Sequence, residues 1–145
     1  MSDKLEKLQI LTENVAEPQL DWERIASWLD EVARLHGRVL GELTYIFCDD
    51  SRILEVNRRF LQHDYFTDII TFDYSRGKLL RGDMYISLDT VATNAEMVGA
   101  AYDTELLRVI VHGVLHLCGI NDKGPGEREI MEANENQALD LMLRS

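Results

Sequence analysis

Proline, cysteine and long apolar runs are all scarce in this sequence of 145 residues. Its two prolines and nine glycines exclude a collagen-like or linker-rich chain. The two cysteines, Cys48 and Cys118, are too few for a disulfide framework, so we expect free thiols in a reducing, cytoplasmic compartment. Uninterrupted apolar stretches extend over only a few residues, whereas a membrane-spanning helix needs roughly 20, so no membrane partner is expected.

Positive charge is scarce as well, because 15 Lys and Arg stand against 26 Asp and Glu, for a net charge of −11. A chain this acidic is not expected to coat nucleic acid, which attracts basic surfaces. The charge is uneven, however, because residues 51–81 carry six basic and four acidic side chains, a net charge of +2. Any phosphate contacts are therefore expected in this segment.

Length and patterning predict one domain, residues 1–145, of the α+β class. Apolar residues make up 46% of the chain and charged residues 28%, as in ordinary globular proteins, and no repeat or linker divides it. Alternating and β-branched stretches predict strands at 8–10, 39–48, 68–74 and 83–88. Helical spacing predicts helices at 22–35, 53–60, 89–99, 104–117 (with Asp103 as its N-cap) and 130–142. The expected architecture is a mixed sheet of about four strands backed by helices.

The helix predicted at 104–117 is apolar around most of its circumference and is expected in the core. It carries His112 and His116, which are four residues apart, so both imidazoles leave the same face. Gly119 can take the left-handed conformation that ends a helix, and the chain can then return to bring Asp122 beneath the histidines. This spacing predicts a metal site on a core helix, with His112, His116 and Asp122 as ligands in a turn like that of the metzincins.

The same residues admit other interpretations. A histidine on an apolar helix is more often a hydrogen-bonded core residue than a ligand, although two unpartnered imidazoles are costly to bury. Zinc peptidases carry Glu directly after the first histidine, where this chain has Gly113, so peptide hydrolysis is disfavoured. Three protein ligands leave a fourth zinc position for a water molecule, whose lowered pKa suits attack on an ester or a phosphodiester.

The segment His-Gly-Val-Leu-His-Leu-Cys-Gly, residues 112–119, resembles the signature of the YbeY family of bacterial metal-dependent endoribonucleases. The resemblance extends, in order, to Asn57 with Phe60, to 67–72, to 82–89, and to the acidic and apolar residues of 127–135. It implies an α+β domain, one Zn²⁺ ion and cleavage of single-stranded RNA. It also implies a cytoplasmic, ribosome-associated role in maturing the 3′ end of the 16S rRNA and in ribosome quality control.

Two departures from the family pattern bear on the site residues. Asp122 stands where the family usually has its third histidine, so the predicted set is two histidines and one carboxylate, which suits zinc and also iron or manganese. Leu61 stands where the family commonly has an arginine. The resemblance then leaves Arg59 as the candidate catalytic residue, with Arg58 and Thr67 as candidate substrate-binding residues. The two arginines are equally well interpreted as solvated charges on a helix surface.

The leading hypothesis is a hydrolase that cleaves single-stranded rRNA at its metal site. One alternative is a ribosome-associated assembly factor whose metal is structural, and another is a metal-dependent hydrolase of a different substrate. His63 is either a proton donor or, more commonly for such a position, a surface histidine. Because the chain is acidic, we expect RNA binding to be weak and salt-sensitive, with the ribosome or a ribosomal protein delivering the substrate.

Overall fold

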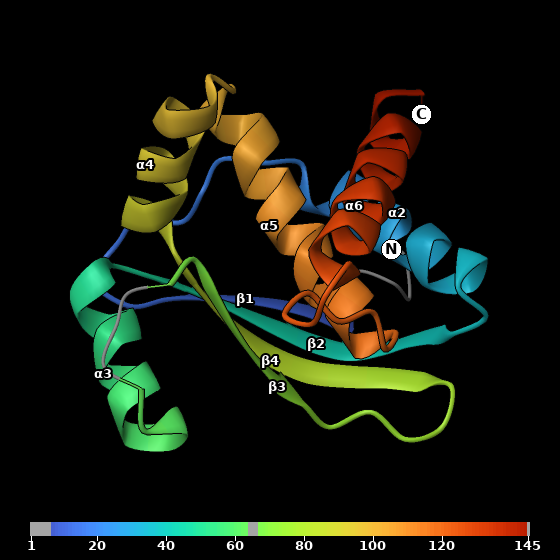
Figure 1. Ribbon diagram of the computed structural model, residues 1–145, viewed down its shortest axis with the longest axis horizontal. Helices are drawn as coiled ribbons and strands as arrows, with labels where there is room; N and C mark the ends of the chain where they lie inside the picture. Colours follow the sequence, from blue (N-terminus) through green and yellow to red (C-terminus); the bar gives the residue numbers. More distant parts are fainter. Residues whose placement is uncertain (1–6, 64–66, 145) are drawn as a thin grey trace.

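The computed structural model describes residues 7–63 and 67–144, and all its elements follow the order expected from the sequence (Figure 1). They are β1 (Leu8–Thr12), α2 (Trp22–Leu35), β2 (Val39–Cys48), α3 (Asp50–Leu61), β3 (Ile69–Asp73), β4 (Leu79–Ser87), α4 (Leu88–Val98), α5 (Tyr102–Leu117) and α6 (Glu127–Arg144). The described residues thus form a single α+β domain with four strands and five helices. None of the described helices combines the length and the apolar character that crossing a membrane requires.

The four strands form one mixed sheet in the order β1-β2-β4-β3. Strand β2 pairs in parallel with both β1 and β4, whereas β3 pairs with β4 in antiparallel fashion. Tyr45 of β2 lies beside Ile10 on one side and Met84 on the other, so the registers of the three parallel strands are aligned. Strand β3 is left at an edge of the sheet, where its second side pairs with no other strand of the described residues.

The main core lies between one face of the sheet and the helices α2, α5 and α6, which Figure 1 shows together on that side. The hydroxyl of the fully buried Tyr45 donates to the carbonyl oxygen of Ile110 at 2.7 Å, which ties β2 to α5. The indole of Trp28 donates to the carbonyl oxygen of Ala138 at 2.7 Å, which ties α2 to α6. Each bond satisfies a buried polar group that would otherwise destabilise the core by about 1–3 kcal/mol.

Helix α3 packs on the other face of the sheet (Figure 1), and its first turn meets the start of α4, where the Thr90 hydroxyl donates to the Asp50 carboxylate. Asp49 caps it by accepting from the backbone N–H of Arg52, as the acidic residues at its start predicted. Its apolar side covers a second, smaller core of Cys48, Ile53, Val56 and Ile70. The sheet is therefore covered fully on one face and only in part on the other.

Of the boundaries that differ from the expectation, two follow from clear structural causes. Strand β4 begins at Leu79 rather than Asp83, because Leu79 and Leu80 pair with the start of β2 directly after the turn at Gly77. Helix α5 begins at Tyr102, its N-cap is Ala101, and no side chain caps it, so the prediction that Asp103 is the N-cap was wrong. Asp103 lies instead in the first turn, where a negative charge complements the helix dipole.

Candidate active site

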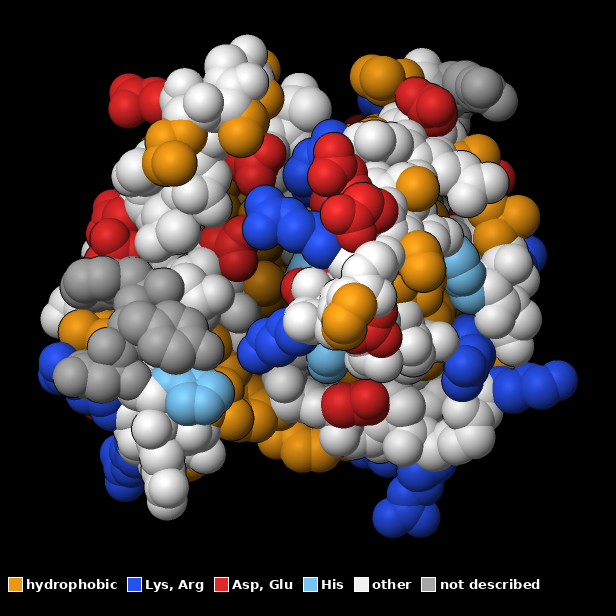
Figure 2. Space-filling model, in the orientation of Figure 1, with side chains coloured by type: hydrophobic (Ala, Val, Ile, Leu, Met, Phe, Trp, Pro, Cys, Tyr) orange, Lys and Arg blue, Asp and Glu red, His pale blue; other side chains and the backbone are white. Residues whose placement is uncertain are grey.

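A cleft of about 870 Å³ opens between the end of α3, the start of β3 and the helices α4, α5 and α6. Figure 2 shows it as a hollow in the molecular surface in which side chains of both charges and histidine meet. The polar side chains that line it include Thr67, Asp68, Glu105, Arg108, His112, His116, Asp122, Lys123, Arg128, Glu132 and Glu135. The cleft therefore contains all three predicted metal ligands.

Helix α5 places the two histidines at the base of this cleft. Nearly all of the helix from Glu105 to Leu117 is buried, yet His112 and His116 remain partly exposed on the side that faces the cleft. The helix ends as predicted, because Gly119 adopts a φ of +93° and the N–H of Ile120 donates back to the carbonyl of Leu115. The returning chain then sets the Asp122 carboxylate 3.3 Å from Nε2 of His112.

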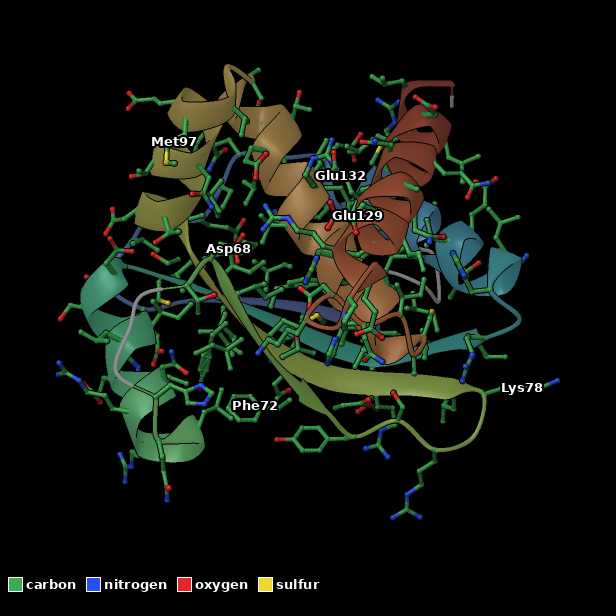
Figure 3. All side chains as sticks on the ribbon, in the orientation of Figure 1. Asp68, Phe72, Lys78, Met97, Glu129 and Glu132 are labelled. Carbon is green, nitrogen blue, oxygen red and sulfur yellow. The ribbon has the colours of Figure 1, made fainter. Side chains whose placement is uncertain are left out.

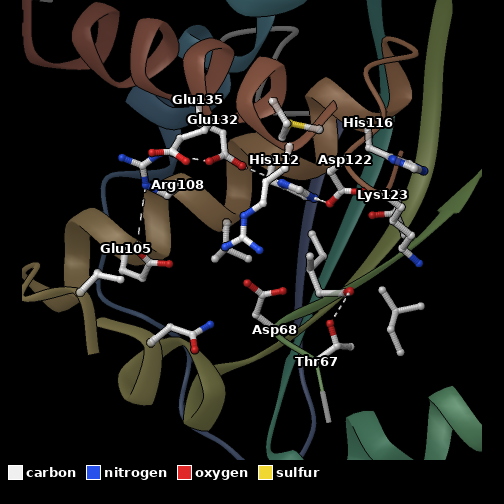
Figure 4. A pocket seen from close by; sticks show the side chains of 18 of the residues that line it. Thr67, Asp68, Glu105, Arg108, His112, His116, Asp122, Lys123, Glu132 and Glu135 are labelled. Carbon is white, nitrogen blue, oxygen red and sulfur yellow. Dashed lines mark hydrogen bonds and ion pairs between the residues drawn. The ribbon is translucent and has the colours of Figure 1, made fainter. Parts of the chain in front are cut away.

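The other ring nitrogen of His112 is held by Glu135 of α6. Nδ1 lies 2.7 Å from Oε2 of this buried carboxylate, and because an ionised carboxylate can only accept, Nδ1 must carry the proton. Nε2 is then the nitrogen that faces Asp122. Glu135 is itself fixed through its second oxygen, which accepts from Arg108 at 3.0 Å (Figure 4). A carboxylate that fixes the tautomer of a histidine in this way is the usual support of a metal-binding imidazole.

Electrostatics in the cleft favour a positive charge on His112. Burial acts to lower the pKa of His112, but the hydrogen bond to Glu135 and the charges of Glu135, Asp68 and Asp122 outweigh it, so this pKa is raised. A cation in place of the proton meets the same acidic surroundings. Since ligand histidines must be neutral, a bound metal would displace the proton of Nε2, while Nδ1 would keep its own.

His116 is not joined to the other two predicted ligands. It lies one helical turn after His112 and lines the same cleft, but Figure 4 shows its ring directed to one side of the His112–Asp122 pair. Among residues 7–63 and 67–144, no three His, Cys, Asp or Glu side chains stand close enough together to hold a metal ion. The structure thus brings together two of the three predicted ligands, and the third ring shares their cleft.

Two further acids in the cleft were not predicted as site residues. Burial raises the pKa of Asp68, against the opposing charge of His112 and hydrogen bonds from the backbone N–H groups of Asp68 and Ile69. Burial also raises the pKa of Glu105, although the guanidinium of Arg108 acts to lower it. Figure 4 shows Asp68 on the floor of the cleft, across from His112. The cleft therefore holds carboxyl groups whose ionisation opposes folding.

Close packing explains why position 113 is a glycine, which the sequence did not reveal. A Cβ atom added at this position would overlap the sulfur of Met84 and would lie 3.2 Å from Cδ1 of Ile69. Helix α5 therefore rests directly on strands β3 and β4 at the residue between the two histidines. The glutamate that zinc peptidases carry at this position has no room here.

The remaining predicted residues divide between the cleft and the surface beside it. Thr67 lines the cleft, and its hydroxyl donates to the carbonyl oxygen of Ile69 at 3.5 Å. Arg58 and Arg59 are exposed in the last turn of α3, and neither is among the described residues that line the cleft. The Arg59 guanidinium lies over the ring of Phe60, with Cζ 5.6 Å from the ring centroid. His63 lines the cleft with an exposed side chain.

Sequence reasoning missed the partner of His112. Glu135 follows His112 by 23 residues and lies on another helix, so no local spacing connects them. Its only signal was its place among the acidic residues of 127–135 that carried the family resemblance. Arg108, on the same face of α5 as His112 and one turn before it, gave no signal at all.

The sequence model of the family described as Endoribonuclease YbeY matches residues 8–142. The chain belongs to the YbeY endoribonuclease family. Endoribonuclease YbeY of Bacteroides thetaiotaomicron is 64% identical over 128 residues, which cover 88% of this chain and 93% of the relative. Endoribonuclease YbeY of Porphyromonas gingivalis strain W83 is 46% identical over 138 residues, 95% of this chain and 91% of the relative.

The solved structures agree with the YbeY assignment at the level of the fold. The solution structure of TM1509 from Thermotoga maritima superposes with a TM-score of 0.65 at 26% sequence identity, covering 93% of this chain and 88% of that one. The resemblance noted from residues 112–119 is thus confirmed over nearly the whole chain. Members of the YbeY family are endoribonucleases by description, and therefore hydrolases.

Proposed function

We propose that this chain is a metal-dependent endoribonuclease that cleaves single-stranded RNA. It would act in the cytoplasm, in maturation of the 3′ end of the 16S rRNA and in ribosome quality control. Its RNA substrate follows from the relatives that carry the same description. The observation that carries the proposal is the arrangement around His112, with Nδ1 on Glu135 and Nε2 directed at Asp122 in an open cleft. The whole chain, residues 1–145, is proposed as one domain of this activity.

The residues of the cleft fit one zinc ion in two of three positions. Two donors at about 2.0–2.1 Å from a tetrahedral zinc lie about 3.3–3.4 Å apart. The separation of Nε2 of His112 and Oδ2 of Asp122 is 3.3 Å. His112 and Asp122 would hold the metal, and His116 would complete the set from the next turn of α5. When bound, the metal would supply a water of lowered pKa and polarise the phosphate, which is what hydrolysis of a phosphodiester needs.

Other side chains of the cleft would orient the metal ligand and bind the RNA. Glu135 keeps the proton on Nδ1 of His112, so that Nε2 is free to act as a ligand. Lys123 and Arg128 place positive charge on the wall of an otherwise acidic cleft, where an RNA phosphate would enter. Thr67 offers its hydroxyl to the substrate in the cleft, as the resemblance implies. Asp68, across the cleft from His112, adds a negative charge that favours a cation at the site.

The place of Arg58 and Arg59 in the structure suits a different role from the one that the resemblance implies. Both project from the end of α3 outside the lining of the cleft, so they would contact phosphates beside the cut site rather than at it. Arg59→Ala is then expected to raise KM for RNA more than it lowers kcat. A loss confined to kcat would instead support the catalytic role predicted for Arg59.

The test is cleavage of an unstructured, end-labelled RNA. Wild-type protein is expected to cut it, to stop after treatment with a chelator, and to resume when Zn²⁺ is restored. Asp122→Ala should lose most of this activity while it keeps the wild-type unfolding temperature. Asp140→Ala, an exposed change on α6 outside the cleft, is the matched control and should cut normally. Equal cleavage by Asp122→Ala and wild type would refute the proposed role of the site.

A ribosome-assembly factor with a structural metal is the second candidate, and the position of Arg58 and Arg59 outside the cleft favours it. The two candidates differ in what a folded Asp122→Ala protein does in cells. An assembly factor would still support maturation of the 16S rRNA, whereas a nuclease would not. A peptidase is disfavoured by the packing at Gly113, and a panel of peptide and RNA substrates would reveal one.

A further inference from the structure

We propose that single-stranded RNA, on leaving the cleft, crosses the edge strand β3 and stacks on an aromatic strip on the opposite face of the sheet. The strip consists of Phe60, Phe72 and Tyr85, with the guanidinium groups of Arg59 and Arg52 at its two ends. The inference rests on the proposed endoribonuclease function and defines where its substrate binds outside the cleft.

The five side chains form one continuous series of ring and cation contacts. Cζ of Arg59 lies 5.6 Å from the centroid of Phe60, whose ring meets Phe72 edge-to-face at 5.8 Å. Phe72 meets Tyr85 edge-to-face at 6.1 Å, and Cζ of Arg52 lies 5.9 Å from the Tyr85 centroid. Arg52 is paired with Glu13 at 3.0 Å and with Glu55 at 2.6 Å, so the charge for a phosphate comes from Arg59. Aromatic rings next to a guanidinium group are a surface on which unpaired bases stack while phosphates meet positive charge.

Part of the strip is exposed and does not serve to cover the small core under α3. Phe72 and Tyr85 pack against that core and remain only partly exposed. Phe60 is 55% exposed, and it is not part of the packing against the core. Tyr74, two residues beyond Phe72 on the same side of the chain, is 54% exposed. Large rings that stand open on one face of a sheet mark a binding surface rather than a core.

The strip is continuous with the cleft. Leu61 and His63 at the end of α3 line the cleft, and Phe60 directly precedes Leu61. On β3 the cleft is lined by Ile69, Ile70 and Thr71, whereas the next residue, Phe72, packs against the small core under α3. Because β3 is an edge strand, nothing among the described strands separates the two faces at this point. Figure 2 shows hydrophobic side chains running from the hollow toward the lower edge of the molecule.

The positive charge around the strip favours RNA over a protein as its ligand. All of the strip except Tyr85 lies within residues 51–81, which carry a net charge of +2 in a chain of −11. Arg59 forms no ion pair with any described acidic side chain, so its charge is available to a phosphate. Beyond Tyr74, the β3–β4 turn carries the exposed Arg76 and Lys78, and Figure 3 shows Lys78 extending outward from its tip. The exposed Arg81 follows in β4. Aromatic rings bordered by basic side chains match an extended polyanion that carries bases.

The experiment compares two RNAs in the intact protein. One is an oligonucleotide short enough to lie within the cleft, and the other is the same sequence extended by unstructured nucleotides. Phe60→Ala is expected to raise KM for the extended RNA by about 5- to 150-fold, the range that corresponds to the stacking of one base on an aromatic ring. It should leave kcat and the KM of the short RNA unchanged. Phe60→Tyr should restore binding, whereas Phe60→Leu, which keeps apolar bulk without a ring, should not.

Leu35→Ala removes an apolar side chain of similar exposure, 60%, from α2 and is the matched control. Thermal unfolding of each variant shows whether Phe60 is needed for the fold, and Phe60→Leu serves if the alanine variant is unstable. Wild-type KM of Phe60→Ala on the extended RNA would overturn the inference while leaving the proposed function intact. If wild type cuts neither RNA, the proposed function fails, and the strip is tested by binding alone. Fluorescence anisotropy would then compare the affinity of Asp122→Ala for the extended RNA with that of the double variant that also carries Phe60→Ala. Equal affinities would overturn the inference as well.

Discussion

Replacing Glu135 by glutamine tests how the cleft sets the protonation of His112. The substitution keeps the shape of the side chain but changes one of its two acceptor oxygens into an NH₂ donor. In the structure, Oε2 of Glu135 faces Nδ1 of His112 at 2.7 Å and Oε1 faces Arg108 at 3.0 Å. A glutamine can satisfy only one of these two neighbours with its remaining oxygen.

Both orientations of the glutamine weaken the site. With its oxygen on Arg108, the NH₂ group faces Nδ1, which must then accept, so the proton moves to Nε2 and blocks the position that faces Asp122. With its oxygen on His112, the NH₂ group opposes the guanidinium of Arg108, which keeps Asn136 at 2.8 Å as a partner. Loss of such a support typically lowers metal affinity about 10- to 100-fold, or about 1.4–2.7 kcal/mol.

The assay is a competition between the protein and a chromophoric chelator for Zn²⁺. Glu135→Gln should show the weaker affinity, and its cleavage of RNA should recover toward the wild-type rate when zinc is saturating. Glu129→Gln makes the same chemical change on an exposed part of α6 outside the cleft and should bind zinc as wild type does (Figure 3). Wild-type zinc affinity in Glu135→Gln would refute the argument that this carboxylate selects the tautomer of His112.

Three smaller changes test the packing and charge around the cleft. Gly113→Ala should lower the free energy of unfolding by about 1–3 kcal/mol in urea, because its Cβ overlaps Met84; an unchanged value would show that Met84 moves aside freely. Burial raises the pKa of Asp68, so the metal-free protein loses stability as the pH rises through that pKa. Asp68→Asn should therefore unfold at a higher temperature than wild type near pH 7 and lose this advantage in acid. A lower unfolding temperature than wild type near pH 7 would contradict this. Tyr45→Phe should cost about 1 kcal/mol by removing the bond to Ile110, and equal urea midpoints would argue against that contribution.

The order of strands and helices could be predicted because apolar periodicity is a local property of the chain. The core helix with His112 and His116 on one face, and its end at Gly119, followed from spacing alone. The early start of β4 did not, because Leu79 joins the strand by pairing with Val39, which is distant in sequence. The absence of a side-chain cap at Ala101 likewise depends on where packing begins the helix rather than on the nearest acidic residue.

The candidate site was predictable only in its sequence-local part. The approach of Asp122 to His112 follows from a tight turn, and the structure places the two together. Glu135 and Asp68 reach the cleft from α6 and from the start of β3, so their roles depend on how distant elements pack. The direction of the His116 ring is a choice of side-chain rotamer that no spacing rule determines.

The central claim is that His112, His116 and Asp122 hold one metal ion on which cleavage of RNA depends. Its most direct test is a titration of chelator-treated protein with Zn²⁺, in which the rate of RNA cleavage is followed. We expect the rate to rise in proportion to added zinc, to reach its plateau at one equivalent per chain, and to stay at the baseline in His116→Ala at the same zinc concentration. Cleavage by the chelator-treated protein at the full rate, without added metal, would contradict it.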